Sequence, residues 1–254
     1  MTFHQLYKIS AFGDYVDIEP SSENMVFLLQ AFEEYNMVTS LYQELPFIQP
    51  YEVLTTQIAP LIPQTFPEQQ RISLLTTDRH EQITIGTSRV DYAIVINDAV
   101  GLKRTHFHDY NMKTCKALNI IFEHFNKKSY RLALFTQSII SSSDDEQVEF
   151  FKKYNNPISI YKERVPQEWS LRSGIRCDIN VNEAIEEINA ITNISKSNFS
   201  RVQGEELLRM DGFSIDIDIN TLAENTSSRF SGGALQSFAD AALGIWDDIW
   251  SDLS

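Results

Sequence analysis

The feature of the sequence that most constrains its fold is the regular alternation of apolar and polar residues over residues 212–220. This stretch reads GFSIDIDIN, and residues 169–180 alternate in a similar way. Successive side chains of a β-strand point to opposite faces of its sheet, so alternation is typical of a strand with one buried face. The sequence therefore predicts two strands that each place an apolar face on a core and a polar face away from it.

The polar faces of these two strands carry charges of opposite sign. Asp216 and Asp218 lie on one strand, in a spacing that metal-binding carboxylates also adopt, and Arg172 and Arg176 lie on the other. If the two strands are neighbours, the charges face each other, and each such cross-strand pair contributes about 0.2–1 kcal/mol. We therefore predict that the two strands are adjacent and that both aspartates are structural, with a metal site as the alternative.

Periodic apolar patterns predict further elements along the chain. Helical spacing is found in residues 22–37, 109–128, 145–154 and 231–253. Strand patterns are found in residues 72–75, 83–85, 90–96, 130–140 and 206–220, whereas residues 182–195 are compatible with either period. Because strands and helices come in mixed runs, we predict an α+β fold. Its sheet is expected to be mixed, largely antiparallel and packed by helices, and the chain to end in a C-terminal amphipathic helix.

Composition divides the chain into two parts. Five of the eight prolines fall within residues 45–67, and residues 1–70 hold one basic residue, Lys8, against nine acidic ones. We predict that residues 1–70 form an acidic, helical and proline-rich segment packed on an α+β core of residues 71–254. The likeness of GIRCDINVN to GFSIDIDIN suggests two similar halves within that core, residues 71–165 and 166–254. A chance recurrence of a strand pattern is the alternative.

The net charge of -14 and the placement of apolar residues exclude several classes of protein. Nucleic-acid binding needs a concentrated positive surface, so nucleic acid is not an expected partner of this acidic chain. No apolar run is long enough to cross a bilayer and no signal-like segment begins the sequence, so a cytoplasmic location without membrane attachment is predicted. Cys115 and Cys177 lie in apolar patterns and are expected to be reduced thiols.

The clearest hint of chemistry is the segment THFHDY, which holds His106, His108 and Asp109. On an extended segment both imidazoles point the same way, and Asp109 can join them as a metal ligand, with His80 or Asp78 brought in by folding. The alternative is a helix lead-in with Asp109 as its cap. Phosphate-binding glycine loops, a nucleophile elbow and a Cys-x-x-Cys pair are all missing from the sequence, so neither a cofactor nor a catalytic residue is predicted.

A basic stretch follows these histidines. Lys113, Lys116 and Lys127 can share the polar side of the helix expected at residues 109–128. Such a face could contact phosphate or nucleic acid. The alternative is a solvated face that complements acidic surface elsewhere in the chain, and the acidic ends of the sequence offer that complement.

The C-terminal helix is expected to carry an apolar surface wider than one core face requires. The candidate interface residues on this surface are Phe238, Ile245, Trp246, Ile249 and Trp250. A surface of that width favours contact with a protein partner, most simply a second copy of the chain in a homo-oligomer. The alternative is that both tryptophans cover the protein's own sheet.

Several segments carry a resemblance to a known family. They are ITIGTSRVDYAIVI, YRLALFTQSII, and GFSIDIDIN followed by a helix that begins near RFSGGALQSF. Over residues 71–254 the chain resembles a sporadically distributed family of uncharacterised bacterial proteins of about this length. It departs from that family's arginine, tyrosine and asparagine strand, because the chain has RLALFTQ there. The resemblance implies no activity and no catalytic residue.

We therefore predict a non-enzymatic protein-interaction or assembly component that self-associates and acts in a bacterial or phage cytosolic process. The alternative is a metal-dependent or phosphate- or nucleic-acid-handling accessory enzyme that uses the region of His106 and His108.

Overall fold

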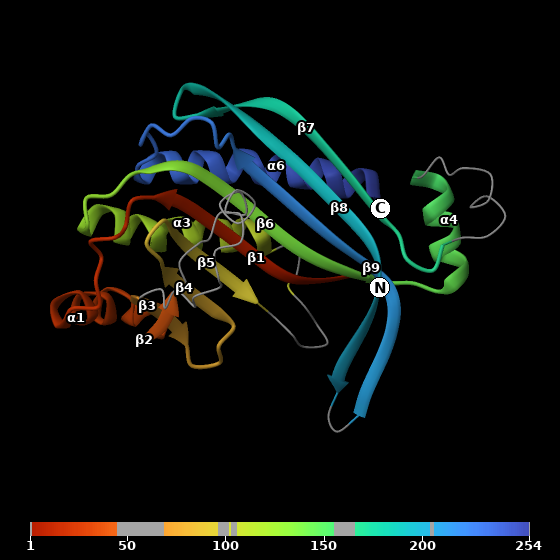
Figure 1. Ribbon diagram of the computed structural model, residues 1–254, viewed down its shortest axis with the longest axis horizontal. Coiled ribbons are helices and arrows are strands. Elements are labelled where there is room, and N and C mark those ends of the chain that lie inside the picture. Colours follow the sequence, from red (N-terminus) through yellow and green to blue (C-terminus); the bar gives the residue numbers. More distant parts are fainter. Residues whose placement is uncertain are drawn as a thin grey trace, which may run out of the picture.

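The structure is built on one antiparallel β-sheet. The computed structural model describes residues 2–44, 69–95, 102, 106–154, 166–203 and 206–253. Its strands are β1 (Thr2–Gly13), β2 (Met37–Glu44), β3 (Gln69–Thr76), β4 (Glu81–Ile85), β5 (Arg89–Val95), β6 (Ser129–Ser141), β7 (Ser170–Val181), β8 (Ala184–Gln203) and β9 (Glu206–Thr221). Within these described residues they form one sheet of nine strands, in the order β2-β3-β4-β5-β1-β6-β9-β8-β7 (Figure 1). Neighbouring strands pair antiparallel throughout.

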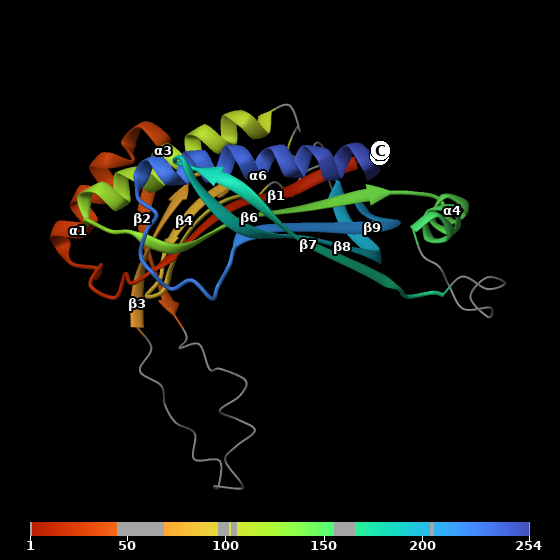
Figure 2. The ribbon, with the colours of Figure 1, turned by 90° about the horizontal axis from the view of Figure 1, so that it is seen from above.

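Helices cover one face of this sheet. They are α1 (Ser22–Ala31), the short 3-10 helix η1 (Glu33–Tyr35), α3 (Phe107–His124), α4 (Asp144–Tyr154) and α6 (Gly232–Leu253). Figure 2 shows α1, α3 and α6 on the same side of the sheet, with α4 beyond its end. We call this side the helix-covered face, and the opposite side, which carries no helix of the described chain, the open face. An α+β fold with a C-terminal helix is thus confirmed, whereas the sheet, expected to be mixed and largely antiparallel, is antiparallel at every described strand pair.

The alternation in β9 separates these two faces. The odd-numbered apolar residues are buried in the core, and they are Phe213, Ile215, Ile217 and Ile219. Asp216 and Asp218 are half-buried and share the open face. Full burial of an isoleucine side chain contributes about 1.5–3 kcal/mol, so this apolar row fixes which face of β9 turns inward.

Helix α6 packs on the sheet and on α3, which lies on the same face. Trp246 of α6 is buried, its Nε1 donates to Thr136 Oγ1 of β6 at 2.8 Å, and its ring centroid lies 4.6 Å from that of Phe107. The side-chain amide of Asn111, from α3, donates to Asp240 Oδ1 of α6 at 2.7 Å. A helix that packs on two neighbours needs a wide apolar surface. This packing accounts for the apolar width of the C-terminal helix.

The N-terminal residues lie inside the sheet rather than on top of it. Strand β1 is the fifth strand of the order and pairs with β5 on one side and β6 on the other. The expected division at residue 70 is therefore not seen, because β1 and β2 belong to the same sheet as the strands of residues 71–254. The expected halves, residues 71–165 and 166–254, both contribute strands to that sheet. The proline-rich residues 45–68 lie outside the described residues.

The predicted adjacency of β7 and β9 is wrong, because β8 lies between them. Most of residues 182–195, whose pattern is ambiguous, belong to β8, which pairs with β7 on one side and β9 on the other. Arg176, Asp216 and Asp218 contact other side chains instead. Arg176 contacts Glu224 at 3.2 Å, Asp216 accepts from the Gln137 amide at 3.0 Å, and Asp218 accepts from the Asn220 amide at 3.0 Å.

Candidate functional site

The predicted metal residues lie at the exposed start of a helix. His106 is the N-cap of α3 and His108 and Asp109 fall in its first turn, so the segment is not extended. Residues two apart on a helix point to opposite sides of it, so the two imidazoles do not converge. Among the described residues there is no group of three histidine, cysteine, aspartate or glutamate side chains placed to hold a metal ion. The geometry therefore favours the helix lead-in, but His106 rather than Asp109 is its N-cap.

The predicted basic cluster is paired with carboxylates. Lys113 Nζ lies 2.6 Å from Glu81 Oε1, and Lys116 Nζ lies 2.9 Å from Glu34 Oε1. Lys127 Nζ lies 2.5 Å from Asp17 Oδ1, and this hydrogen bond lowers the pKa of the Asp17 carboxyl. The hydrogen bond to Glu34 raises the pKa of Lys116, because it stabilises the charged form of the lysine. All three lysines thus complement acidic side chains of the same chain, which is the alternative that the charge distribution offered.

The predicted partner surface on the C-terminal helix is largely internal. Phe238, Trp246 and Trp250 are buried, and Ile245 and Ile249 are partly buried against the core. The two tryptophans pack on each other and on His4, which comes from β1. The structure corrects the expectation of an exposed interface here, because these side chains cover the protein's own sheet.

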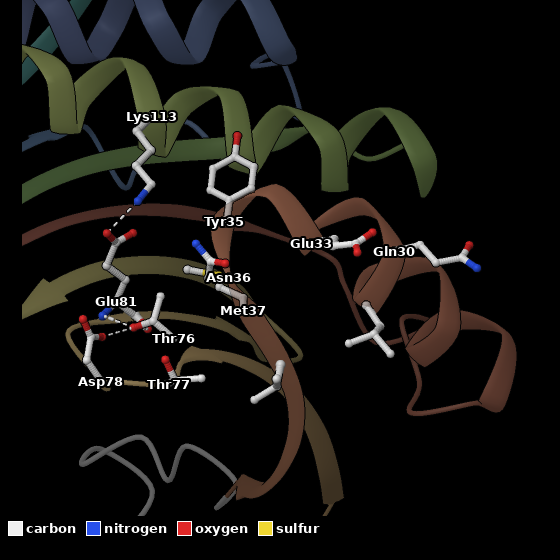
Figure 3. Close-up of a pocket in the computed structure, with 12 residues that line it drawn as sticks. Gln30, Glu33, Tyr35, Asn36, Met37, Thr76, Thr77, Asp78, Glu81 and Lys113 are labelled. Atoms are coloured by element: carbon white, nitrogen blue, oxygen red, sulfur yellow. Dashed lines mark hydrogen bonds and ion pairs between the residues drawn. The ribbon is translucent and has the colours of Figure 1, made fainter.

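A groove of about 800 Å³ opens beside α1 on the β2 side of the sheet. Figure 3 shows its walls, which come from the end of α1, η1, the start of β2, the turn between β3 and β4, and Lys113 of α3. Asn36 has a φ of 54°, a left-handed conformation that ends the helical segment and turns the chain into β2. This turn brings Tyr35 and Met37 to the groove.

Glu81 forms the polar centre of the groove. Its Oε1 accepts from Lys113 Nζ at 2.6 Å, and its Oε2 accepts from the Tyr92 hydroxyl. Its backbone N–H donates to Thr76 Oγ1 at 3.0 Å, while that hydroxyl donates to Asp78 Oδ1 at 2.6 Å (Figure 3). Both carboxylate oxygens of Glu81 are therefore engaged, so this group is a poor general base.

The phenols around the groove are held in their neutral form. Burial raises the pKa of Tyr92 well above its usual value, and the hydrogen bond to Glu81 raises it further. Burial also raises the pKa of Tyr35, whose buried hydroxyl has no hydrogen-bond partner within the described chain. A phenol that stays protonated donates hydrogen bonds but does not act as a base or nucleophile at neutral pH. The groove is therefore suited to binding rather than to acid-base chemistry.

The raised pKa of Tyr92 predicts a pH dependence of stability. Above about pH 10 the unfolded chain loses the phenolic proton while the folded chain keeps it, so folding is weakened as the pH rises. A phenol with a raised pKa makes the free energy of unfolding fall by up to about 1.4 kcal/mol per pH unit in that range. The variant Tyr92→Phe removes this contribution. Urea unfolding at a series of pH values above neutrality should show a shallower decline for the variant, and equal slopes would contradict the assignment.

Apolar side chains line part of the groove and continue its surface. Leu29 of α1 is 46% exposed and Val38 of β2 is 49% exposed, and both line the groove. Val26 and Leu41 are comparably exposed on the same two elements. Large apolar side chains gathered beside a concave site favour contact with an apolar group of a partner.

The sequence singled out two residues of the groove, each for another role: Lys113 as a contact for phosphate or nucleic acid, and Asp78 as a further metal ligand. Tyr35, Glu81 and Tyr92 come from three separate elements, and their meeting depends on the pairing of β4 with β5 and on the docking of α3. No spacing in the sequence signals such a meeting.

No family model, curated protein or solved structure matches the chain. The likeness to bacterial proteins over residues 71–254 stays a prediction. Among the helices that the structure describes, none has both the length and the apolar character needed to cross a membrane.

Proposed function

We propose that this protein is a non-enzymatic interaction or assembly component that self-associates, in a bacterial or phage cytosolic process. The observation that carries the proposal is the exposed margin of the sheet at β7. This strand is the last of the order, and most of its residues are exposed. A long edge strand presents unpaired backbone N–H and C=O groups that can pair with a strand of another chain.

The β8–β9 hairpin supports the same proposal. The pairing of β7 with β8 begins at Ser170 and Ser195, and that of β6 with β9 ends at Ser141 and Gly212. The pairing of β8 with β9 continues beyond both, as far as Gln203 and Glu206. Figure 1 shows this extension as an arm that projects from the sheet. A projecting hairpin with two strand edges extends the surface available for assembly.

The enzymatic alternative finds less support in the described residues. His106 and His108 do not converge, and the lysines beside them are paired with carboxylates. The carboxylate and phenols of the groove are likewise occupied or held neutral, as described above. The geometry that remains is that of surfaces for binding.

Self-association is tested by the mass of the protein in solution. Sedimentation velocity across a wide range of protein concentration should show a species of twice the chain mass that grows with concentration. Ile175→Lys places a charge on the exposed margin and should shift the chain toward the monomer, whereas Met112→Lys on the exposed side of α3 should leave the distribution unchanged. A monomer at every concentration would contradict the proposal.

A further inference from the structure

The outer margin of β7 has two chemically distinct rows of side chains. Ile175 pairs with Ala190 of β8, which pairs with the buried Ile219 of β9, so Ile175 belongs to the helix-covered face. It is nevertheless 61% exposed. Helix α6 is tied to the far end of the strand, where Ser237 Oγ accepts from the backbone N–H of Asn182 at 3.1 Å. The middle of β7 therefore presents an apolar side chain that α6 leaves exposed.

The two rows follow from the strand alternation. The row on the helix-covered face is apolar or small, and its members are Leu171, Ser173, Ile175, Cys177 and Ile179. The row on the open face is mostly charged, and its members are Arg172, Gly174, Arg176, Asp178 and Asn180. Arg176 contacts Glu224 at 3.2 Å. Within the described chain, Arg172 and Asp178 have neither an ion pair nor a side-chain hydrogen bond.

Resting on the proposed self-association, we infer that two copies of the chain pair through β7, antiparallel, about a two-fold axis at Ile175. In this register Arg172 lies opposite Asp178 of the second copy, and the symmetry repeats the pair. Leu171 lies opposite Ile179 in the same way, and the two Ile175 side chains meet at the axis. The charges of Arg172 and Asp178 thus face opposite charges and the apolar side chains face apolar ones, while Arg176 lies opposite Gly174 and keeps its own partner Glu224.

The neighbouring registers are less favourable. An axis at Gly174 places Arg172 opposite Arg176, and an axis at Arg176 places that residue opposite itself, so both oppose like charges. An axis at Cys177 would pair Arg176 with Asp178 but would place Arg172 opposite Asn182. The strand ends at Val181, and Asn182 has a φ of 48°, outside the extended range. The axis at Ile175 overlaps more of the strand than the axis at Cys177, and it uses the two charges that are unpaired in the described chain.

The symmetry of this pairing also fits the layers of the fold. A two-fold axis perpendicular to the sheet keeps the helix-covered faces of both copies on one side and their open faces on the other. The result is a continuous sheet across both copies. Figure 1 shows β7 running along the outer margin of the sheet, where a second β7 would lie. Pairing of the two edge strands also removes the exposed backbone groups of each.

A cysteine pair tests the register. With the axis at Ile175, Ser173 lies opposite Cys177 of the second copy. The variant Ser173→Cys should therefore form a disulfide-linked dimer on mild oxidation, visible on a non-reducing gel and reversed by reductant. The wild-type chain should not cross-link, because Cys177 faces Ser173 and Cys115 is buried. The control Ser173→Cys/Cys177→Ser should not cross-link either, since the introduced thiol of one copy would not face that of the other.

The mass measurement separates failure of this register from failure of self-association. If sedimentation shows a dimer and Ser173→Cys does not cross-link, the pairing at β7 in this register is wrong while self-association stands. Cross-linking of the wild-type chain through Cys177 would move the axis to Cys177 and would also overturn the inference. A wild-type chain that stays monomeric overturns both the inference and the proposed function. Cross-linking of Ser173→Cys alone supports both.

Discussion

Replacing Arg71 with methionine is expected to lower the free energy of unfolding by about 3–5 kcal/mol. Arg71 is 2% exposed, although it carries a full positive charge. Its guanidinium donates to backbone carbonyl oxygens at 2.6 to 3.3 Å, those of Tyr15, Val16, Ile85 and Gly86. Methionine fills a similar volume but leaves these acceptors without a donor, and a buried acceptor without a partner costs about 1–3 kcal/mol.

Urea unfolding followed by circular dichroism measures this loss. Arg71→Lys should recover only part of it, because an ammonium group cannot span the carbonyls that the planar guanidinium reaches. Lys116→Met is the matched control: it also exchanges a cation for methionine, but this cation is exposed and pairs with Glu34 at the surface. Its effect should be much smaller. If the two methionine variants were equally stable, Arg71 would not hold the loop after β1 to the turn between β4 and β5.

Replacing Trp246 with alanine is expected to cost about 3–5 kcal/mol of the free energy of unfolding. Trp246 is 1% exposed, its indole packs 4.6 Å from Phe107 and 5.8 Å from Trp250 between ring centroids, and its Nε1–H bonds to Thr136. The variant leaves a cavity between α6 and the sheet and leaves the Thr136 hydroxyl without this donor. The loss should appear as a lower urea midpoint with a nearly unchanged slope.

A surface substitution of the same kind serves as the control for Trp246. Met112→Ala removes an apolar side chain that is 57% exposed on α3, and its effect should stay within about 0.5 kcal/mol. The variant Trp246→Phe should fall between Trp246→Ala and the wild type, because it keeps a ring in the core. A wild-type midpoint for Trp246→Ala would contradict the assignment of α6 to the core.

Strongly periodic segments were predicted well by the sequence, and segments with an interrupted period were not. Strand β1 was missed because a β-bulge between His4 and Leu6 shifts its phase, which breaks the alternation. Strand β8 was ambiguous because Ile185, Ile188, Ile191 and Ile194 recur at intervals of three, which suits a helix. Pairing with a strand on each side decides this case in favour of a strand. Strand pairing is a long-range effect that local pattern cannot report.

The candidate site residues depend on tertiary contacts even more than the strands do. The apolar width of α6 was visible in the sequence, but not the fact that α3 and the sheet both use it. The basic residues in and after α3 were visible, but their carboxylate partners come from as far as Glu34 and Asp17 in the chain. The charges on β7 were also visible, yet their expected partner strand was displaced by β8. The alternation in β7 gives this strand an apolar row and a charged row, and these rows can complement those of a second copy.

Assembly of the chain through its β7 margin is tested by charge reversal combined with sedimentation. Arg172→Asp and Asp178→Arg each place like charges opposite one another twice per dimer, and each should raise the dissociation constant about tenfold or more. The double variant Arg172→Asp/Asp178→Arg restores opposite charges and should return the dissociation constant to within about threefold of the wild-type value. Weakening by both single changes with recovery in the double variant is the predicted result. Single variants that dimerise like the wild type, or a double variant that dimerises as weakly as the single ones, would contradict assembly through β7.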